Sequence, residues 1–547
     1  MKEEHLIADI VIYNGKVLTV NETNDVAEAV AIRDNKILNV GNYQNMQQYI
    51  GKHTKLIDAK NKTVMPGFID AHIHVALLAL LNHAIINISY PIAKSIEDIK
   101  QIIRQEAAKK KKGEWILLMG YDQDKLLDKR HPTKEDLDEA APDHPVLCAR
   151  SCAHLAVYNS YAFRLAGITD GSKFGPGEIV LNENGELHGL TKESANSYIA
   201  SKAAFDEDAI LAGLKTMNDL LLSYGITSIH DGGCNGSVAI KAMQRASKNG
   251  DMKVRIYPMI FTIYGKEPSK ELIHAFTQSG IRTGLGNENF MIGPAKIMID
   301  GSTSGPSAAM IDGYSHEPSN HGVLTWEAEE AKEMVVQAHK EGFQVTAHAT
   351  GDQAVTIMVD AYEKALEQFP KKGHRHRIEH CALTNTELLT RIADLELIPV
   401  SNPAFLINSG SAYQTYYGER TNYMFPLQSY LERGIINAFG SDAPAGNMNP
   451  MYSLHGALNR MDMKTGEVIG ECQRIDILNA VRMFTYNGAY ASFEENIKGS
   501  IEKGKLADVI ILSEDILSYP VEEIQNVKVL CTIIDGEIVY DVRNDKE

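Results

Sequence analysis

Two histidines separated by one residue, His72 and His74, close an apolar run in the stretch MPGFIDAHIHV, residues 65–75. On a strand, side chains at this spacing point to the same face, where both imidazoles can bind one metal ion. The chain contains 19 histidines, and a second pair with the same spacing occurs at His374 and His376. The spacing alone is therefore weak evidence, and the surroundings of each pair must decide.

Further ligand types lie where predicted strands end in loops. The stretches AKIMIDG, VTAHATGD, HRIEHC and IINAFGSDAP contribute Lys296, His348, His380 and Asp442. A single histidine at a strand end is usually structural, but several strands that each present a ligand type indicate one shared site. Imidazoles and a carboxylate that converge there make a transition-metal site with hydrolytic potential.

The second pair, His374 and His376, comes at the start of its predicted strand, whereas His380 comes at the C-terminal end of the same strand. This position favours His380 as the ligand. It leaves His374 and His376 as supporting or surface residues.

Lys296 lies within an apolar strand, where a charged and buried amine costs free energy. It either reaches solvent or pairs with Asp300, or it loses its proton and reacts with carbon dioxide to form a carbamate. A carbamate would supply the anionic bridge that two neighbouring metal ions need to offset their repulsion. The residues alone leave both readings open.

Two kinds of element must position these residues. The first sixty residues and the C-terminus are short, apolar-alternating segments with turn signals at Asn14-Gly15, Asp34-Asn35 and Asp535-Gly536, which predict hairpins in a β-domain shared by both termini. Residues 205–490 repeat strand, loop and helix, which predicts a parallel sheet, open or closed into a (β/α)8 barrel. Both designs place function at the C-terminal ends of the strands.

Composition narrows the class of protein. A chain of 547 residues exceeds one ordinary core. Its net charge of -17 argues against a nucleic-acid partner, whose phosphates it would repel. The N-terminus lacks the features of a signal peptide, and no run approaches the roughly 18 apolar residues of a membrane span. We expect a cytoplasmic protein that acts on a small molecule, without a membrane partner.

The sequence resembles the amidohydrolase superfamily of metal-dependent hydrolases, and within it the YtcJ-like branch that includes N-substituted formamide deformylases. The matching stretches cover nearly the whole chain: MPGFIDAHIH, CAHLAVYNSYAFRLAGI, GITSIHDGG, KIMIDGSTSGPSAAM, HATGDQAV, HRIEHC, FGSDAP and GSIEKGKLADVIIL. The resemblance implies an α/β fold, a (β/α)8 TIM barrel with a small β-sandwich domain from both termini and an α+β insertion after the first barrel strand. The corresponding boundaries are 1–64 and 496–547 for the sandwich, 65–90 and 205–495 for the barrel, and 91–204 for an inserted domain that covers the active site.

The resemblance also implies a centre of one or two divalent metal ions, usually Zn2+, and a homodimer by analogy. His72 and His74 match the ligands of the first strand, His348 and His380 match the next two, and Asp442 matches the aspartate of the eighth strand. Lys296 matches the lysine expected to be carbamylated, whereas related branches use a glutamate or cysteine bridge.

The function expected from this centre is hydrolysis of a non-peptide amide bond in an N-acyl amine, an N-formyl amine or a cyclic amide. A metal-activated hydroxide would attack the carbonyl, and Asp442 would take a proton and pass it to the leaving nitrogen. The alternatives are a lactonase, esterase or phosphotriesterase with the same centre, and a non-catalytic barrel. An aromatic deaminase fits less well, since Ala-Thr-Gly-Asp follows His348.

Two further histidines are candidates for binding substrate. His230 ends the predicted strand ITSIHDGG, where a structural role explains it equally well. His154 lies in the insertion, within CAHLAVYN, and would face the substrate pocket if the insertion caps the mouth of the barrel.

Overall fold

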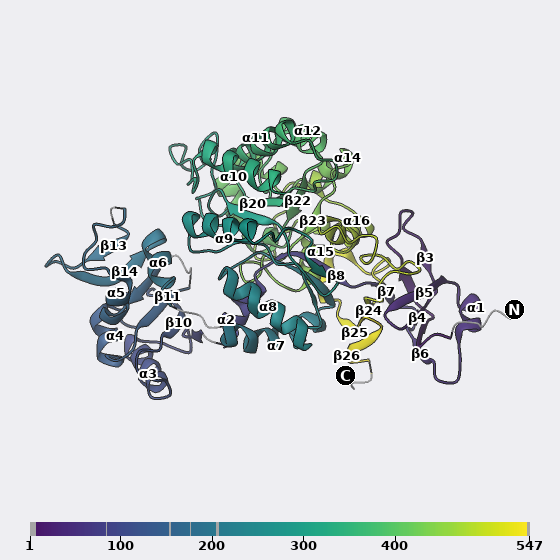
Figure 1. The fold of residues 1–547 in the computed structure, drawn as a ribbon, viewed down its shortest axis with the longest axis horizontal. Helices are drawn as coiled ribbons and strands as arrows, with labels where there is room; N and C mark the ends of the chain where they lie inside the picture. Colours follow the sequence, from purple (N-terminus) through teal and green to yellow (C-terminus); the bar gives the residue numbers. More distant parts are fainter. Residues whose placement is uncertain (1–6, 84, 152–154, 176, 204–206, 544–547) are drawn as a thin grey trace.

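The computed structural model describes residues 7–83, 85–151, 155–175, 177–203 and 207–543. Figure 1 shows three lobes side by side. A β-rich lobe combines the purple strands of the N-terminus with the yellow strands of the C-terminus, a central lobe alternates strands and helices, and a third, blue lobe is inserted between α2 and α7.

Parallel strands form the frame of the central lobe. In chain order they are β8 (Phe68–Ile73), β15 (Ile226–Asp231), β16 (Arg255–Ile256), β19 (Ala295–Met298), β20 (Val345–Ala349), β21 (Arg377–His380), β22 (Ile398–Ser401) and β23 (Ala438–Phe439). Each pairs with its neighbour in the parallel sense within the runs β8–β15–β16 and β19–β20–β21–β22–β23. β16 also pairs with β18 (Phe290–Met291), which pairs with β17 (Gly286–Asn287).

Contacts beyond the strand ends close these runs into a ring. Ile260 bridges Ala295, which joins the segment after β16 to β19. At the other seam, the backbone N–H of Asp442 donates to the carbonyl oxygen of His72 at 2.7 Å. Gly440 permits this approach, since a Cβ there would lie 2.5 Å from Cβ of His72. The central lobe is therefore a TIM-barrel-like α/β fold.

Helices surround the barrel. They are α2 (Val75–His83), α7 (Glu207–Ser223), α8 (Ser237–Asn249), α9 (Lys266–Gln278), α10 (Ala328–Lys340), α11 (Asp352–Gln368), α12 (Thr386–Asp394), α13 (Phe405–Tyr417), α14 (Leu427–Glu432), α15 (Pro450–Asn459), α16 (Ile477–Met483) and α17 (Tyr486–Ala491). Helix α11 buries Val355, Met358, Ala361, Tyr362 and Ala365 in the main core. Their spacing of three and four residues is that of a helix with one face on a sheet.

The β-rich lobe contains two sheets. One has the order β5 (Lys36–Gly41), β4 (Ala29–Arg33), β1 (Ile10–Tyr13), β6 (Lys55–Asp58). The other has the order β26 (Glu537–Asp541), β25 (Val529–Ile534), β24 (Val509–Leu512), β7 (Thr63–Pro66), β2 (Lys16–Leu18), β3 (Val26–Ala27). Both termini thus build one lobe, and a shared core includes Ile12, Val30, Ile511 and Ile533.

The turn signals of this lobe have different outcomes. Asp34-Asn35 joins the antiparallel pair β4–β5, and Asp535-Gly536 joins β25–β26, so these two hairpin predictions are confirmed. The prediction for Asn14-Gly15 is wrong, because β1 and β2 belong to different sheets. The two residues carry the chain across the core instead, and packing between the sheets overrides a local turn preference.

The inserted lobe carries a sheet of order β13 (Ile179–Leu181), β14 (Leu187–Lys192), β12 (Leu155–Tyr158), β11 (Val146–Arg150), β10 (Ile116–Tyr121), β9 (Ile86–Asn87). Its helices are α3 (Ile96–Ala107), α4 (Lys134–Ala140), α5 (Ser160–Ala166) and α6 (Glu193–Ala200). Two apolar clusters in this lobe contain no residue of the barrel among those described. The predicted boundaries of the three parts stay predictions.

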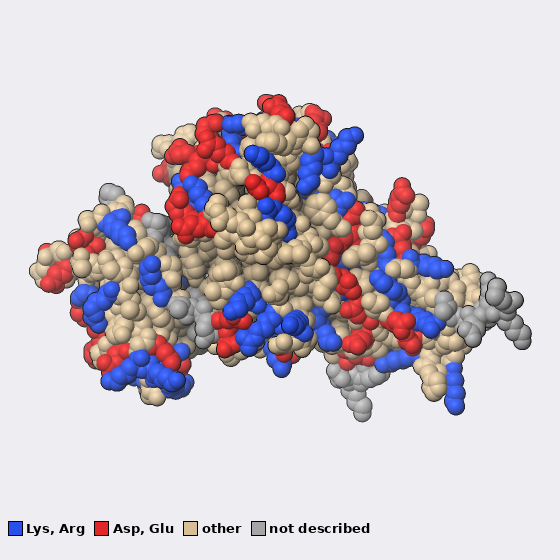
Figure 2. Space-filling model, in the orientation of Figure 1, with Lys and Arg blue, Asp and Glu red and all other residues tan. Residues whose placement is uncertain are grey.

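Charged side chains are interspersed on the face that Figure 2 shows. Blue side chains gather at the lower tip of the inserted lobe, near α3, with red ones beside them. There Lys109 pairs with Glu106 at 3.0 Å and Lys112 pairs with Asp143 at 2.6 Å. Across the described ranges, no helix is both long enough and apolar enough to traverse a bilayer.

Candidate metal centre

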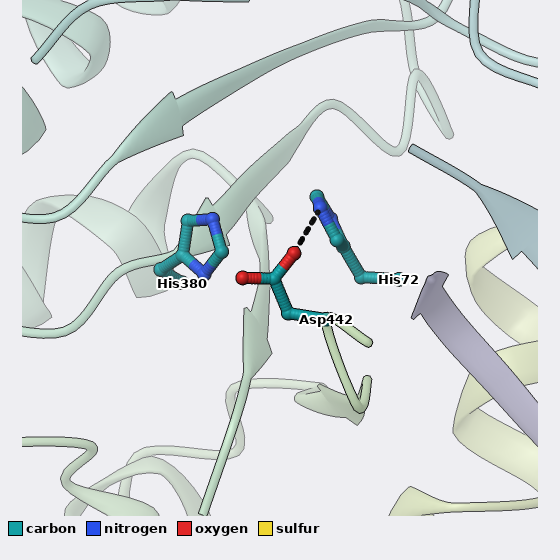
Figure 3. A group of neighbouring side chains, drawn as sticks. All are labelled: His72, His380 and Asp442. Atoms are coloured by element: carbon teal, nitrogen blue, oxygen red, sulfur yellow. Dashed lines mark ion pairs between the residues drawn. The ribbon is translucent and has the colours of Figure 1, made fainter. Parts of the chain in front are cut away.

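Three of the predicted ligands meet directly at the C-terminal ends of the barrel strands. His72 on β8, His380 on β21 and Asp442 after β23 offer ligand atoms that lie within 4.8 Å of one another. Figure 3 shows the carboxylate of Asp442 between the two imidazole rings. Oδ1 of Asp442 lies 3.4 Å from Nε2 of His72. Residues far apart in sequence therefore form one compact group of nitrogen and oxygen donors.

The other three predicted ligands border this group. Nε2 of His74 lies 3.2 Å from Oδ1 of Asp442, and Nζ of Lys296 lies 3.4 Å from Nε2 of His72. The ring of His348 stands 4.5 Å from that of His380 between centroids. All six residues predicted from the sequence are thus brought to one end of the barrel.

The imidazole rings are held through the nitrogen that faces away from the group. Nδ1 of His74 donates to the carbonyl oxygen of Gly233 at 2.7 Å, and Nδ1 of His380 donates to Oδ1 of Asn402 at 2.7 Å. Nδ1 of His72 is hydrogen-bonded to Glu379. These contacts fix the tautomers and leave the Nε2 lone pairs directed to the group, which is the arrangement of metal-binding histidines in proteins. The donor set therefore fits a divalent metal ion.

Burial keeps the histidines of this group neutral. It lowers the pKa of His72 to about 4, with a further contribution from the charge of Lys296, and lowers the pKa of His380 well below its usual range. Burial alone would raise the pKa of Asp442, but its hydrogen bond to His74 holds it below its usual value. At neutral pH the group thus offers uncharged imidazoles and a carboxylate, the forms that bind metals.

Lys296 is buried, and its Nζ donates to the carbonyl oxygen of Gly232 at 2.9 Å. Burial lowers the pKa of its amine to about 8, although the negative charges of Glu379 and Asp442 act to raise it. The pairing with Asp300 considered from the sequence is wrong, because that carboxylate accepts from the backbone N–H groups of Ala309, Thr350 and Gly351 instead.

His380 reaches the group because the backbone leaves the strand conformation. Side chains alternate along β21, and Arg377 and Glu379 point into the barrel, where they contact residues of β8. Regular alternation would turn His380 towards the surrounding helices. Its φ of 69° and that of 45° at Cys381 redirect it. Asp442 also has a positive φ, 53°, and such uncommon backbone conformations concentrate at functional sites.

Sequence reasoning missed Arg377 and Glu379, a fully buried ion pair whose Nε–Oε1 distance is 2.8 Å. The signal was present, since HRIEHC places two charged residues two positions apart in a strand that must be buried on both faces. It also missed Asn402, which holds His380 and donates to the carbonyl oxygen of Gly440 at 2.8 Å.

The second His-x-His pair lies at the opposite end of β21. Nε2 of His374 donates to the carbonyl oxygen of Leu395 at 3.0 Å, while Nδ1 accepts from the backbone N–H of His376. Nδ1 of His376 accepts from the N–H of Val345, and its Nε2 contacts Nδ1 of His339 at 2.8 Å. Every nitrogen of this pair is used within the protein, so His374 and His376 support the fold.

The two candidates for substrate binding are placed differently. His230 is fully buried inside the barrel, where its Nδ1 accepts from a guanidinium N–H of Arg377 at 2.9 Å and its ring meets Tyr257 edge-on. Burial and the charge of Arg377 lower its pKa well below the usual range. His154 lies outside the described residues. Both roles stay predictions.

A cavity of about 80 Å3 adjoins the group. Its wall combines hydroxyl, amide and aromatic side chains with three of the predicted ligands: Ser302, Thr303, Ser304, His348, Thr350, His380, Phe405, Asn408, Ser409, Tyr413, Asp442 and Ala445. The residues from α13 share one helical face. His230 and the described part of the insertion do not contribute to this wall. Two larger hollows, of about 480 and 620 Å3, contain none of the predicted ligands.

A model of the amidohydrolase family matches residues 55–540, nearly the whole chain. The chain belongs to the amidohydrolase family. Within the family it is 27% identical over 543 residues to the N-substituted formamide deformylase of Arthrobacter pascens, covering 97% of this chain and 98% of that protein. It is 26% identical over 545 residues to YtcJ of Bacillus subtilis, covering 97% and 99%. The predicted resemblance, including the YtcJ-like branch, is confirmed.

The fold of the family extends to solved structures. A metal-dependent hydrolase from Pyrococcus horikoshii superimposes with a TM-score of 0.77 at 24% identity, covering 94% of this chain and 99% of that chain. This likeness agrees with the TIM-barrel-like α/β fold seen here, so that part of the predicted fold class is confirmed.

Proposed function

We propose that this amidohydrolase hydrolyses a non-peptide amide bond with a divalent metal centre held by His72, His74, His348, His380 and Asp442, with Lys296 as a carbamylated bridge. The observation that carries the proposal is the convergence of these side chains at one end of the barrel, with His72, His380 and Asp442 within 4.8 Å of one another. Similarity along the full length to an N-substituted formamide deformylase supports an amide as substrate.

The fixed tautomers of the imidazoles make these residues suited to Zn2+, which binds imidazole nitrogen and carboxylate oxygen in catalytic sites. A bound ion supplies a Lewis acid that polarises a carbonyl oxygen and lowers the pKa of water. Lys296 supports a carbamate because its buried amine has no carboxylate within ion-pairing distance in the described structure. A carbamate would also convert the charge of this group from positive to negative, which favours cations nearby.

Asp442 is the residue we assign to proton transfer. It is the single carboxylate among the described residues that line the cavity, and 13% of its side chain is exposed. From this place its carboxylate takes a proton from the attacking water and passes it to the nitrogen of the leaving amine. Amines leave poorly unless they are protonated, so amide hydrolysis depends on such a shuttle.

The size and lining of the cavity indicate which acyl group the substrate carries on its scissile carbonyl. A cavity of about 150 Å3 holds benzene, so 80 Å3 holds roughly three or four non-hydrogen atoms. No lysine or arginine lines it among the described residues. We therefore assign it a short, uncharged acyl group such as formyl or acetyl, with the amine part of the substrate outside it.

The test is amine release from a series of anilides with formyl, acetyl, butyryl and succinyl groups, assayed with Zn2+ and after chelation. We expect turnover of the two short, neutral substrates, abolished by chelation and reduced by at least a hundredfold in Asp442→Asn. Lactones and a phosphotriester in the same panel test the alternative reactions. Faster turnover of those esters than of every amide would overturn the proposal.

A further inference from the structure

We infer that Glu379, held in place by Arg377, is a positioning residue that sets the metal affinity of His72. The inference rests on the proposed metal centre and goes beyond it, because neither residue is among the ligands. Glu379 contacts Nδ1 of His72, on the side of the ring opposite to the group that would hold the ion. A carboxylate only accepts hydrogen bonds, so this contact fixes the proton of His72 on Nδ1.

Both oxygens of Glu379 are fully engaged. Oε1 accepts from Nε of Arg377 at 2.8 Å and from the hydroxyl of Thr346, while Oε2 accepts from a second guanidinium nitrogen at 3.0 Å and from His72. Glu379 and Arg377 are both 0% exposed. The carboxylate thus has one orientation available to it, and the imidazole that it holds has one as well.

Arg377 ties this pair to two further strands. Its Nη2 also donates to the carbonyl oxygen of Ala71 at 2.6 Å, next to His72 in the chain, and its Nη1 donates to Nδ1 of His230. One guanidinium therefore fixes both the backbone before His72 and the acceptor of its ring. Lysine could not do this, because an ammonium lacks the planar fork of donors.

The other predicted histidine ligands have neutral acceptors. His74 and His348 donate to the carbonyl oxygens of Gly233 and Gly301, at 2.7 and 3.0 Å, and His380 donates to an amide oxygen. Among the four, His72 alone has a carboxylate as the hydrogen-bond acceptor behind its ring, since Oδ1 of Asp300 stays 3.6 Å from Nε2 of His348, beyond hydrogen-bonding distance. A charged acceptor increases the electron density of the ring and makes its free nitrogen a better donor to a metal. His72 should therefore be the tightest of the four imidazole ligands.

The experiment measures Zn2+ binding to the full chain by competition with a chelator, without substrate. The variant is Glu379→Gln, which keeps the shape of the side chain and removes its charge. The matched control is Glu495→Gln, because Glu495 also pairs with an arginine through two contacts, to Arg375 at 2.7 and 2.8 Å, but does not touch a predicted ligand. The absorption spectrum of the Co2+ form of each protein reports the ligand geometry.

We expect Zn2+ affinity to fall tenfold to a hundredfold in Glu379→Gln, as is typical when a partner of a metal ligand is lost, with a changed Co2+ spectrum. The control should keep both properties. Equal affinities for the variant and the wild type would overturn the inference. If Glu379→Gln does not fold, Thr346→Val removes one hydrogen bond to Glu379 and should weaken binding about threefold; unchanged affinity there would equally reject it.

The outcomes separate the inference from the proposed function. A wild-type chain that binds no divalent metal rejects both. A chain that binds Zn2+ but hydrolyses no amide rejects the proposed reaction alone, and the role of Glu379 is then judged on binding. A chain that binds Zn2+, hydrolyses amides and keeps its affinity in Glu379→Gln rejects only the inference.

Discussion

Nζ of Lys296 lies 3.4 Å from Nε2 of His72, so an amine stands where an anion would serve a metal centre better. The amine is buried and donates a hydrogen bond to the carbonyl oxygen of Gly232. A carbamate on this nitrogen would resolve the conflict between a cationic side chain and a site for cations.

Replacement of Lys296 by methionine keeps an unbranched side chain and removes the nitrogen. We expect the metal content at saturation to fall by about one ion per chain and turnover to fall at least a hundredfold. Elemental analysis measures the first quantity. Lys253→Met, at a half-exposed lysine that pairs with Glu537, is the control. In 13C-bicarbonate the wild type should show a carbamate signal that Lys296→Met lacks; a signal in neither protein contradicts the bridge.

The burial of His376 predicts how the free energy of unfolding depends on pH. Burial holds its pKa well below the value of 6.5 that it has in the unfolded chain. Below pH 6.5 the unfolded state therefore binds more protons than the folded state, so the free energy of unfolding falls as pH is lowered, by up to about 1.4 kcal/mol per pH unit. Burial raises the pKa of Asp70 to about 7, so the titration of this carboxyl group changes the free energy of unfolding in the opposite direction.

A comparison of variants separates these contributions. We expect His376→Gln to be less stable than the wild type at pH 7.5 but to lose less stability between pH 7 and pH 5, measured by chemical unfolding. The contribution of Asp70 is common to both proteins and cancels. Metal content should not change in His376→Gln, unlike in His72→Ala. A variant that loses its metal would contradict the structural role of His376.

Gly232 lies against two of the imidazole rings. A Cβ at this position would meet Cε1 of His74 at 2.8 Å and Nε2 of His72 at 3.0 Å. We expect Gly232→Ala to displace the rings and lower Zn2+ affinity at least tenfold, and overpacking at this buried position should cost about 1–3 kcal/mol of stability. Gly41→Ala, whose Cβ would meet its first neighbour at 3.7 Å, should leave affinity unchanged.

Asn402 links His380 to the strand that precedes Asp442. Its amide accepts from His380 and donates to Gly440, both at buried positions. Asn402→Ala leaves these two groups without partners, which costs about 1–3 kcal/mol per group. We expect a lower melting temperature and weaker Zn2+ binding, whereas Asn402→Asp should retain the acceptor for His380 and bind Zn2+ more tightly than Asn402→Ala. The reverse order would show that the ring is oriented by other contacts.

Phe405 is one of two aromatic residues, with Tyr413, in the described cavity wall. Removal of its ring in Phe405→Ala enlarges the space next to Asp442. The ratio of kcat/KM for butyryl over formyl anilide should rise at least tenfold, a change within reach of a few methylene contacts. Phe369→Ala lies away from the cavity and should not alter the ratio. An unchanged ratio in Phe405→Ala would place the acyl group elsewhere.

The sequence predicted the positions of the six proposed ligands because strand ends are marked by local signals, namely apolar runs followed by polar loops. It could not predict what depends on the backbone or on distant partners. Regular alternation along β21 would direct Glu379 to the interior of the barrel and His380 away from it. The positive φ of His380 turns its side chain back towards the metal-binding group. Asn14-Gly15 failed as a hairpin because β2 pairs with β7, about 45 residues later in the chain, and not with β1.

The second sheet of the β-rich lobe can be completed only late in synthesis of the chain. β7 has its antiparallel partner in β24, and β24 pairs in turn with β25, so the N-terminal strands leave the ribosome long before these neighbours exist. At about 5–20 residues per second the delay between β7 and β24 is roughly 20–90 seconds. During that time an unpaired apolar edge is open to other chains. A chaperone that shields nascent strands should therefore raise the yield of this protein more than that of an isolated barrel.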